Sequence, residues 1–526
     1  MQNPQMRRLL KGAWTLSLAA LIAKILSAVY RVPFQNLVGN TGFYVYQQVY
    51  PLYGIGMTFA LSGFPVFISK LVAEAREPEA QATVTHQALV LLTWLSGGMF
   101  LGLYGCAAWI AKAMADPALA SLIRMVALMF LTMPLLATGR GYFQGTFDMS
   151  KTAVSQVVEQ VIRVVVILLA AVVAVHDQWN PYQMGTVAMS GAFFGGLAAL
   201  ASLWPAYRRV FAHRRFAWPG LATYRHLLRR FVREGGSIAL FAAMLIVLQL
   251  VDSFTVTRGL TTSGIGMATA KSLKGIYDRG QPLVQLGLVV ATALSATLLP
   301  SLTTAYATRR MRRFEQTAAQ LIRFNLALSL AATAGLIVLM PAVNWLLFGD
   351  TAGEAALATY VGAILLVAMI NAYNAILQSL NRYRGTTRTL FIGFVVKLAI
   401  NQWLVTRMGT LGASVATAIA LVVIAGLLAL QVPAAIHRLA NANHFGLKLG
   451  VVIAVMSVGV WASMRLLPFA SRLDAIMQAG VGVIVGVGLF IASATVVRLF
   501  SAREVLALPL GRRFLKMISG HRDGVK

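Results

Sequence analysis

Apolar residues fall in fourteen long stretches along the chain, separated by short polar or basic segments. The hydrocarbon core of a bilayer, about 30 Å thick, is crossed by roughly 20 apolar residues in a helix. Each stretch therefore predicts one membrane-spanning helix, and the fold class predicted is an all-α polytopic membrane protein. The expected spans are residues 12–32, 43–70, 84–111, 118–139, 153–175, 183–206, 235–257, 270–302, 316–342, 355–380, 388–406, 410–436, 447–466 and 475–499.

The basic residues between the spans predict the orientation of the chain. Cytoplasmic loops of membrane proteins are enriched in lysine and arginine. Segment 207–233 holds eight arginines, and further clusters lie at 309–313, 382–388 and 512–516. With fourteen spans, all of these follow even-numbered helices, on the side of the basic N-terminus. Both termini are therefore expected in the cytoplasm.

The long basic connection also suggests a division of the chain. Six spans precede it, six follow it and two close the chain, which predicts an N-lobe at 1–206, a basic connection at 207–234, a C-lobe at 235–436 and a final part at 437–526. Two pseudosymmetric six-helix lobes with a substrate site between them are a common plan among transporters.

Composition agrees with a membrane location. Of the 526 residues, 58% are hydrophobic and only 12% are charged, whereas a soluble domain has about 25% charged residues. The net charge of +29 is explained by positive loops rather than by nucleic-acid binding. A single cysteine excludes an intramolecular disulfide framework, and the N-terminal segment lacks a signal-peptide cleavage pattern, so the first span is expected to be retained.

Two cations interrupt the first span. Lys24 and Arg31 are seven residues apart and share one helix face, and a cation costs about 2.5–3.5 kcal/mol at a helix centre. Lys24 falls near mid-membrane. Arg31 lies closer to the outer surface, where its side chain could alternatively extend to the lipid headgroups.

The eighth span, residues 270–302, begins with a polar half. Lys271, Lys274 and Asp278 fall at i, i+3 and i+7 on one face, with Arg279 adjacent. This pattern suits a helix that lines a water-filled cavity. The alternative is a helix whose first turns protrude outside the membrane as a solvated face.

Three further charged residues lie inside apolar helices. Asp252 in the seventh span could pair with a cation in the cavity, bind a coupling ion, relay protons or make a structural hydrogen bond. In the fifth span, Glu159 and Arg163 have i, i+4 spacing, which predicts an ion pair within one helix. We expected that pair to be structural.

An excess of cations over carboxylates in a cavity favours an anionic substrate. Phosphate oxygens accept strong charge-assisted hydrogen bonds from lysine and arginine, so a lipid diphosphate headgroup fits. Lys24, Arg31, Lys271, Lys274 and Arg279 are the candidate substrate-binding residues. Asp252 and Asp278 are candidates for ion coupling or for pairing within the cavity. No cofactor and no metal site are expected.

Several segments carry a resemblance to a known family. These include "RRLLKGAWTLSLAALIAKILSAVYRVPFQNLVGNTGFYVYQQVYPLYG", "SGFPVFISKLVAEA", "GYFQGTFDMSKTAVSQVVEQVIRV" and "YDRGQPLVQLGLVVATALSATLLPSL". The chain resembles the multidrug/oligosaccharidyl-lipid/polysaccharide exporter superfamily, and within it the polysaccharide-biosynthesis branch related to stage V sporulation protein B and MurJ-type lipid II flippases. The resemblance implies two lobes with alternating access and a cationic cavity.

The resemblance also implies roles for particular residues. It assigns a transport arginine of the eighth helix to Arg279 and the first-helix cations to Lys24 and, with a one-residue shift, Arg31. An arginine pair that some flippases carry in the second helix is missing from "YPLYGIGMTFALSG", which leaves the identity of the saccharide open. The last two helices are expected to form a groove for the polyprenyl tail.

The function predicted is therefore a flippase in the bacterial plasma membrane. It would move a polyprenyl-diphosphate-linked saccharide, such as lipid II or a related cell-envelope precursor, without breaking a bond. Membrane lipids and enzymes of cell-wall synthesis are the expected partners. Energy would come from the membrane potential or an ion gradient, because the chain has no G-x-x-x-x-G-K-[ST] pattern.

Three other readings stay open at this point. A cation-coupled drug antiporter of the same superfamily would need carboxylates in the cavity, for which Asp252 and Asp278 are the candidates. A membrane-embedded glycosyltransferase would need acidic or histidine residues on large outer loops, where His176 and Asp177 are the single such pair. A non-transporting scaffold would leave the charges inside the first and eighth spans unexplained.

Overall fold

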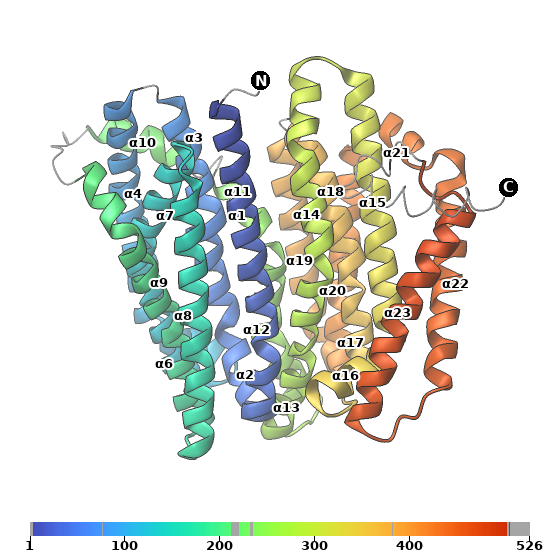
Figure 1. The fold of residues 1–526 in the computed structure, drawn as a ribbon. Helices are drawn as coiled ribbons and strands as arrows, with labels where there is room; N and C mark the ends of the chain where they lie inside the picture. The colour runs from blue at the N-terminus through green and yellow to red at the C-terminus, as the bar shows by residue number, and fades with distance from the viewer. Residues whose placement is uncertain are drawn as a thin grey trace. The chain divides into compact units, whose positions relative to one another are not determined.

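The computed structural model describes residues 4–75, 77–211, 220–231, 235–380, 382–501 and 504. Within these residues the chain is helical and contains no strand, which confirms the predicted all-α class (Figure 1). The chain up to the basic connection forms α1 (Pro4–Val29), α2 (Arg31–Thr58), η1 (Phe59–Gly63), α3 (Phe64–Glu74), α4 (Pro78–Gly105), α5 (Ala107–Ala113), η2 (Pro117–Leu119), α6 (Ala120–Ala127), α7 (Met129–Gly145), α8 (Met149–His176) and α9 (Pro181–Phe211).

The remaining helices follow in two runs. The first run is α10 (Leu221–Arg230), α11 (Gly236–Ala242), α12 (Met244–Thr262), α13 (Met267–Asp278), α14 (Gly280–Ala307), α15 (Met311–Val338), α16 (Met340–Phe348), α17 (Glu354–Val361) and α18 (Ala363–Ser379). The second run is α19 (Tyr383–Met408), α20 (Thr410–Gln431), α21 (Ala434–Ala440), η4 (Ala442–His444), α22 (Phe445–Arg465) and α23 (Arg472–Val496).

The helices form two compact units. The first unit contains Met1–Leu286 together with Thr387–Ala420, and the second contains Gly287–Thr386 together with Leu421–Lys526. α12, α13 and most of α19 therefore belong to the same unit as α1–α9. The expected division into two pseudosymmetric six-helix lobes stays a prediction.

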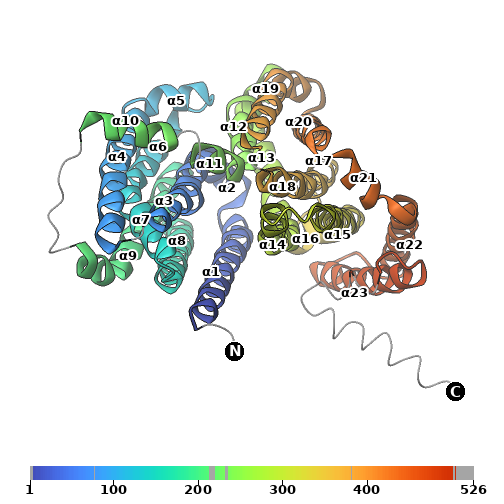
Figure 2. The ribbon, with the colours of Figure 1, turned by 90° about the horizontal axis from the view of Figure 1, so that it is seen from above.

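In the first unit, α8 packs along α1 and α9, and α2 contacts α9, α12 and α13 (Figure 2). Small residues allow the closest of these approaches. A Cβ at Gly195 of α9 would lie 2.7 Å from the carbonyl oxygen of Glu159 in α8. Large aromatic side chains of α2, including Phe43, Tyr46 and Tyr53, fill the core between the helices.

One backbone irregularity precedes the second expected span, residues 43–70, and another lies inside it. Gly39 adopts φ 69° and ψ −176° inside α2, a backbone conformation essentially restricted to glycine. It turns the chain between the end of the first span and the start of the second. Further along, η1 is a single π-helical turn, a feature often found at functional sites.

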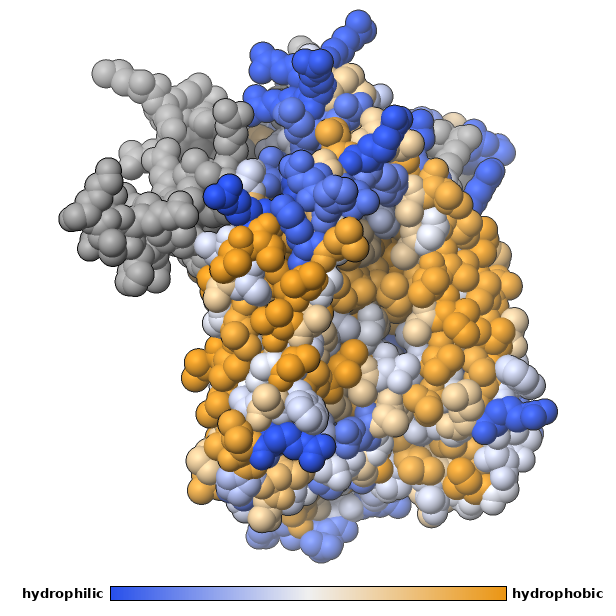
Figure 3. All heavy atoms as spheres, turned by 90° about the vertical axis from the view of Figure 1, so that its right-hand side faces the viewer, coloured by the Kyte–Doolittle hydropathy of each residue, from blue (hydrophilic) through white to orange (hydrophobic). Residues whose placement is uncertain are grey.

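In the second unit, α15 packs against α18, α21 and α22, and α23 packs against α22 and α16. α23 begins with a capping box, in which the Ser471 hydroxyl accepts from the Asp474 amide while the Asp474 carboxylate accepts from the Ser471 amide. Figure 3 views the face of α22 and α23, where hydrophobic side chains form a broad band. The α14–α15 connection and the first turn of α15 carry exposed arginines, at positions 309 and 310 and at positions 312 and 313.

The apolar surface identifies the membrane-facing helices. Trp94, Leu430, Leu466 and Val496 have 78–85% of their surface exposed, which suits contact with lipid tails. Twelve segments in the described part of the chain are long and apolar enough to cross a membrane. One of these, Leu18–Thr58, joins the first two expected spans, and α13–α14 is not among the twelve. The polytopic architecture is confirmed, and the count of fourteen stays a prediction.

Candidate functional site

A buried ion pair joins α12 to α19. The Lys397 ammonium lies 2.8 Å from the Asp252 carboxylate, and the two side chains are 0% and 1% exposed. Asn401, one turn from Lys397, donates to the other Asp252 oxygen at 3.0 Å, and the Tyr277 hydroxyl of α13 donates to Asp252 at 3.1 Å. Asp252 is therefore satisfied entirely by groups of the protein, which matches one of the roles considered for it.

A second buried ion pair lies within α13. Lys274 donates to both oxygens of Asp278 at 2.6 and 2.7 Å, and the two side chains are 1% and 0% exposed. Gln281 donates to the same carboxylate at 3.0 Å. Lys274 thus does not lie on a solvated face, and Asp278 bonds to the lysine one turn away.

Arg279 is held at the start of the second span. Its guanidinium donates to the Asn40 side-chain oxygen at 2.6 Å, and Arg279 is 1% exposed. The backbones meet closely here, because a Cβ at Gly275 would lie 2.1 Å from the Asn40 carbonyl oxygen. The turn at Gly39 and the missing side chain at Gly275 together place α13 against Asn40.

Arg31 is buried among tyrosine side chains. It is 0% exposed, and none of its three guanidinium nitrogens has a hydrogen-bond partner among the described residues. The guanidinium lies 4.3 Å from the centre of the Tyr50 ring. Its side chain does not extend to the lipid headgroups. A buried guanidinium without a hydrogen-bond partner among the described residues suits an anionic ligand.

Tyrosines of α2 form a wall beside Arg31. Tyr46, Tyr50 and Tyr53 follow one another along a single helix face, with ring centres 6.3 and 5.6 Å apart. The Tyr53 hydroxyl accepts a hydrogen bond from Arg163 of α8, and the Tyr46 hydroxyl lies 3.0 Å from that of Tyr30. The wall thus presents ring faces and hydroxyl groups together.

We define the buried charge cluster as six side chains of the first unit: Arg31, Asp252, Lys274, Asp278, Arg279 and Lys397. Asp278 interacts electrostatically with Asp252 and Arg31 as well as with Lys274, and Lys397 interacts with Lys274 and Asp278 as well as with Asp252. The six come from α2, α12, α13, the turn after α13, and α19. Four cations face two carboxylates, which leaves a formal excess of two positive charges.

The structure places the other predicted residues as follows. Lys271 lies away from the cluster, 3.0 Å from Asp116. Lys24 lies in α1, but its side chain is outside the described residues. The predicted ion pair between Glu159 and Arg163 is wrong: Glu159 bonds to Arg140 of α7 at 2.6 Å, because the guanidinium of Arg163 turns toward Tyr53.

Lys397, Asn401 and Arg140 were missed by sequence reasoning. The same rule that singled out Lys24 applies to Lys397, since both are lysines inside an apolar helix. Asn401 follows Lys397 at i+4 on the same face. Arg140 sits at the end of an expected span, in "GRGYFQG", where a loop position was assumed.

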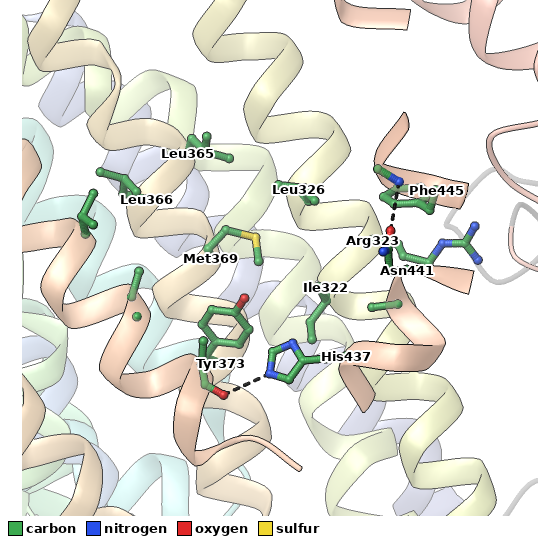
Figure 4. Close-up of a pocket in the computed structure, with 16 residues that line it drawn as sticks. Ile322, Arg323, Leu326, Leu365, Leu366, Met369, Tyr373, His437, Asn441 and Phe445 are labelled. Carbon is green, nitrogen blue, oxygen red and sulfur yellow. Dashed lines mark hydrogen bonds between the residues drawn. The ribbon is translucent and has the colours of Figure 1, made fainter. Parts of the chain in front are cut away.

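The second unit contains an apolar cavity of about 490 Å³. It is lined by α15, α18, α20 and α21 and by the start of α22. Figure 4 shows Tyr373 and His437 close to one another at its wall, with ring centres 5.8 Å apart. A site of this volume and lining suits an apolar chain. Of the two helices expected to form a lipid groove, α22 contributes and α23 does not.

Charged side chains buried among the helices of an all-α polytopic membrane protein are typical of membrane transporters. Comparison with known proteins supports this class. The computed structure matches a solved structure of a lipid II flippase, MurJ, in an inward closed conformation. The TM-score is 0.68 at 11% sequence identity, covering 91% of this chain and 98% of that one.

The chain belongs to the polysaccharide biosynthesis protein family, whose pattern it matches over residues 9–306. It is 34% identical to the uncharacterized membrane protein YabM of Bacillus subtilis (strain 168), covering 97% of this chain and 96% of that protein. It is 27% identical to the lipid II flippase MurJ of the same organism, over 78% and 80% of the two chains. The resemblance found in the sequence is confirmed: the protein is a membrane transporter of the multidrug/oligosaccharidyl-lipid/polysaccharide exporter superfamily, whose named members among the matches are transporters and flippases rather than enzymes.

Proposed function

We propose that this transporter moves a polyprenyl-diphosphate-linked saccharide from the inner to the outer leaflet of the bacterial plasma membrane. The single observation that carries the proposal is the buried guanidinium of Arg31, which has no hydrogen-bond partner among the described residues. An uncompensated buried cation is costly, so its retention in an apolar helix favours an anionic ligand. Diphosphate oxygens match a guanidinium in both charge and geometry.

The surroundings of Arg31 support this choice. Arg279 and Lys274 lie in the same buried charge cluster, in which cations outnumber carboxylates, and such a cluster would favour the negative charges of a diphosphate diester. The tyrosine wall beside Arg31 offers ring faces and hydroxyl groups, which suit a sugar attached to the diphosphate. MurJ of Bacillus subtilis, one of the relatives above, is named a lipid II flippase. The proposed substrates are lipid II and related cell-envelope precursors that carry the same diphosphate linkage.

The cation antiporter is the weaker candidate. Such a protein needs a carboxylate that is available to the drug or to a coupling ion. Asp252 is occupied by Lys397 and Asp278 by Lys274, so both candidate carboxylates already have an internal ammonium partner. The cluster therefore favours an anion. The cytoplasmic location of both termini and a partnership with cell-wall enzymes stay predictions.

Lipid binding to the purified protein tests the proposal. Native mass spectrometry would compare an undecaprenyl-diphosphate saccharide with a zwitterionic phospholipid, on wild type, Arg31→Ala and Arg279→Ala. Arg124→Ala is the matched control, because Arg124 is an exposed arginine of α6. We expect selective binding of the diphosphate lipid by wild type and the control, reduced at least about ten-fold in the two test variants, as for loss of a charged hydrogen bond.

A transport measurement completes the test. Proteoliposomes would contain a fluorescent diphosphate-linked saccharide, and dithionite added outside would quench the molecules that reach the outer leaflet. Arg31→Ala should slow the appearance of quenchable lipid, while Arg124→Ala should not. Equal binding of both lipids, unchanged in every variant, would contradict the proposed substrate class.

A further inference from the structure

A buried carboxylate ties Lys271 to the segment before α6. Asp116 is 2% exposed and lies 3.0 Å from the Lys271 ammonium. It also accepts hydrogen bonds from Tyr182 of α9 at 2.7 Å and from Tyr44 of α2 at 3.2 Å. Lys271 in turn donates to the Tyr182 hydroxyl at 2.6 Å. A single carboxylate therefore joins residues from three helices.

A second contact lies on the same segment. Arg258 of α12 donates to the carbonyl oxygen of Ala113 at 2.8 Å. Residues 107–119, which form α5, η2 and the turn between them, thus receive a cation from α12 and another from α13. We call this set of contacts the outer latch.

All parts of the outer latch lie near helix ends. The charge pattern predicts that these ends are at the outer, non-cytoplasmic surface of the membrane. Residues 107–119 cover the end of the third expected span, its connection to the fourth and the start of the fourth. Tyr182 immediately precedes the sixth expected span, and Lys271 lies at the start of the eighth. Tyr44 lies at the start of the second. The structure brings these ends together within hydrogen-bonding distance, so the latch closes this side of the first unit.

Lys271 and the buried charge cluster share one helix. Lys274 follows Lys271 by one turn of α13, and Arg279 caps that helix. Lys271 is therefore the cation of α13 that lies nearest to the end of the helix expected at the outer surface. Lys271 has 17% of its side-chain surface exposed, so it is accessible to an approaching group, whereas the Asp116 carboxylate is covered.

We propose that Asp116 is a positioning residue that occupies Lys271 until the substrate diphosphate displaces it. This inference rests on the proposed function. A diphosphate carries two negative charges and more acceptor oxygens than one carboxylate, so it competes well for an ammonium group. Displacement removes the cation that holds residues 107–119 against α13. Arrival of the substrate at Lys271 thereby releases α13 from the Asp116 carboxylate and weakens the outer latch.

Cysteine labelling from outside tests the latch without a ligand. In a Cys106→Ser background, two single-cysteine reporters are placed at buried positions on either side of the latch, Ala270→Cys in α13 and Met114→Cys in the segment. Both positions are 0% exposed. Asp116→Asn should make either reporter react at least about five-fold faster with a membrane-impermeant maleimide, as expected for loss of a partly buried ion pair.

Asp177→Asn is the control, because Asp177 is an exposed carboxylate in the connection between α8 and α9. It should leave labelling unchanged. If each reporter is labelled at the same rate with Asp116 present and with Asp116→Asn, the proposed role of Asp116 in holding the outer latch is refuted. A merely structural role for Asp116 would lower stability without creating a response to ligand, so the second arm adds the undecaprenyl-diphosphate saccharide.

The ligand arm separates this inference from the proposed function. We expect the diphosphate lipid to accelerate labelling when Asp116 is present and to add nothing in Asp116→Asn. Binding of the lipid by native mass spectrometry without any change in labelling would overturn displacement while leaving the proposed function standing. Absence of binding would overturn the proposed function and the displacement step together, and the ligand-free comparison would still decide whether Asp116 holds the latch.

Discussion

The ion pair between Lys397 and Asp252 allows a quantitative prediction. At 2.8 Å the Coulomb attraction is about 6 kcal/mol for an effective dielectric constant of about 20. Desolvation of two buried ions offsets most of this, so the pair contributes little to stability relative to a neutral pair of similar size. Removal of one partner leaves the other as a buried charge, which costs about 3–5 kcal/mol.

We therefore expect Lys397→Met to lower the free energy of unfolding by about 3 kcal/mol, at the lower end of that range, because Asn401 and Tyr277 still donate to Asp252. Asp252→Asn should have a comparable effect, since the ammonium then lacks its carboxylate. The double variant Lys397→Met/Asp252→Asn should lose much less than the sum of the two single variants.

Unfolding in mixed detergent micelles with increasing dodecyl sulfate would measure these differences, with the nine tryptophans as the fluorescence signal. Lys112→Met, a lysine with an exposed side chain in the last turn of α5, controls for loss of a lysine as such. The reasoning is refuted if both single variants unfold within about 1 kcal/mol of wild type, or if the double variant loses the full sum expected for independent sites.

Three further outcomes are expected. Gly275→Ala should abolish transport and reduce the yield of folded protein in size-exclusion chromatography, because its Cβ would lie 2.1 Å from the Asn40 carbonyl oxygen and the backbone must move; unchanged transport would contradict the close approach. Glu159→Ala should lower the unfolding free energy by about 3–5 kcal/mol, because the Arg140 charge then stays buried without its carboxylate partner. Glu159→Ala/Arg140→Met should recover most of this loss in the same assay. Ser471→Ala should cost about 1 kcal/mol without slowing transport in proteoliposomes, since it removes a helix cap remote from the cluster.

The positions of the helices along the chain could be predicted from the sequence, because the hydrophobic length of a segment and the charge of a loop do not depend on how the helices pack. The bilayer imposes one span length on every helix, so the apolar stretches predict the helices without any knowledge of their packing. The turn at Gly39 was not predicted. The sequence "LVGNTG" is equally compatible with a glycine in a loop and with a single non-helical glycine inside an otherwise continuous helix.

The charged residues were predicted less well than the helices. Asp252, Asp278, Lys274 and Arg279 were identified because any ion within an apolar stretch stands out. Their partners were not, since pairing depends on which helix faces meet.

The failed pairing of Glu159 with Arg163 shows the same limit. Spacing at i, i+4 predicts that two side chains can meet on one helix, but a neighbouring helix offered each a different partner. Arg140 on α7 bonds to the carboxylate and Tyr53 on α2 accepts from the guanidinium. Packing of helices decided between local and distant contacts.

The excess of two positive charges in the buried charge cluster has a consequence for energetics. Under the proposed function, a carrier loaded with a diphosphate diester would hold no net charge among these six side chains, whereas the empty carrier would hold two positive charges. The membrane voltage would then act on the empty form and have little effect on the loaded form. Each charge that crosses the full field changes in energy by about 2.3 kcal/mol per 100 mV. We expect an imposed potassium diffusion potential to change the rate of repeated cycles in proteoliposomes, and to leave a single turnover of preloaded protein unaffected.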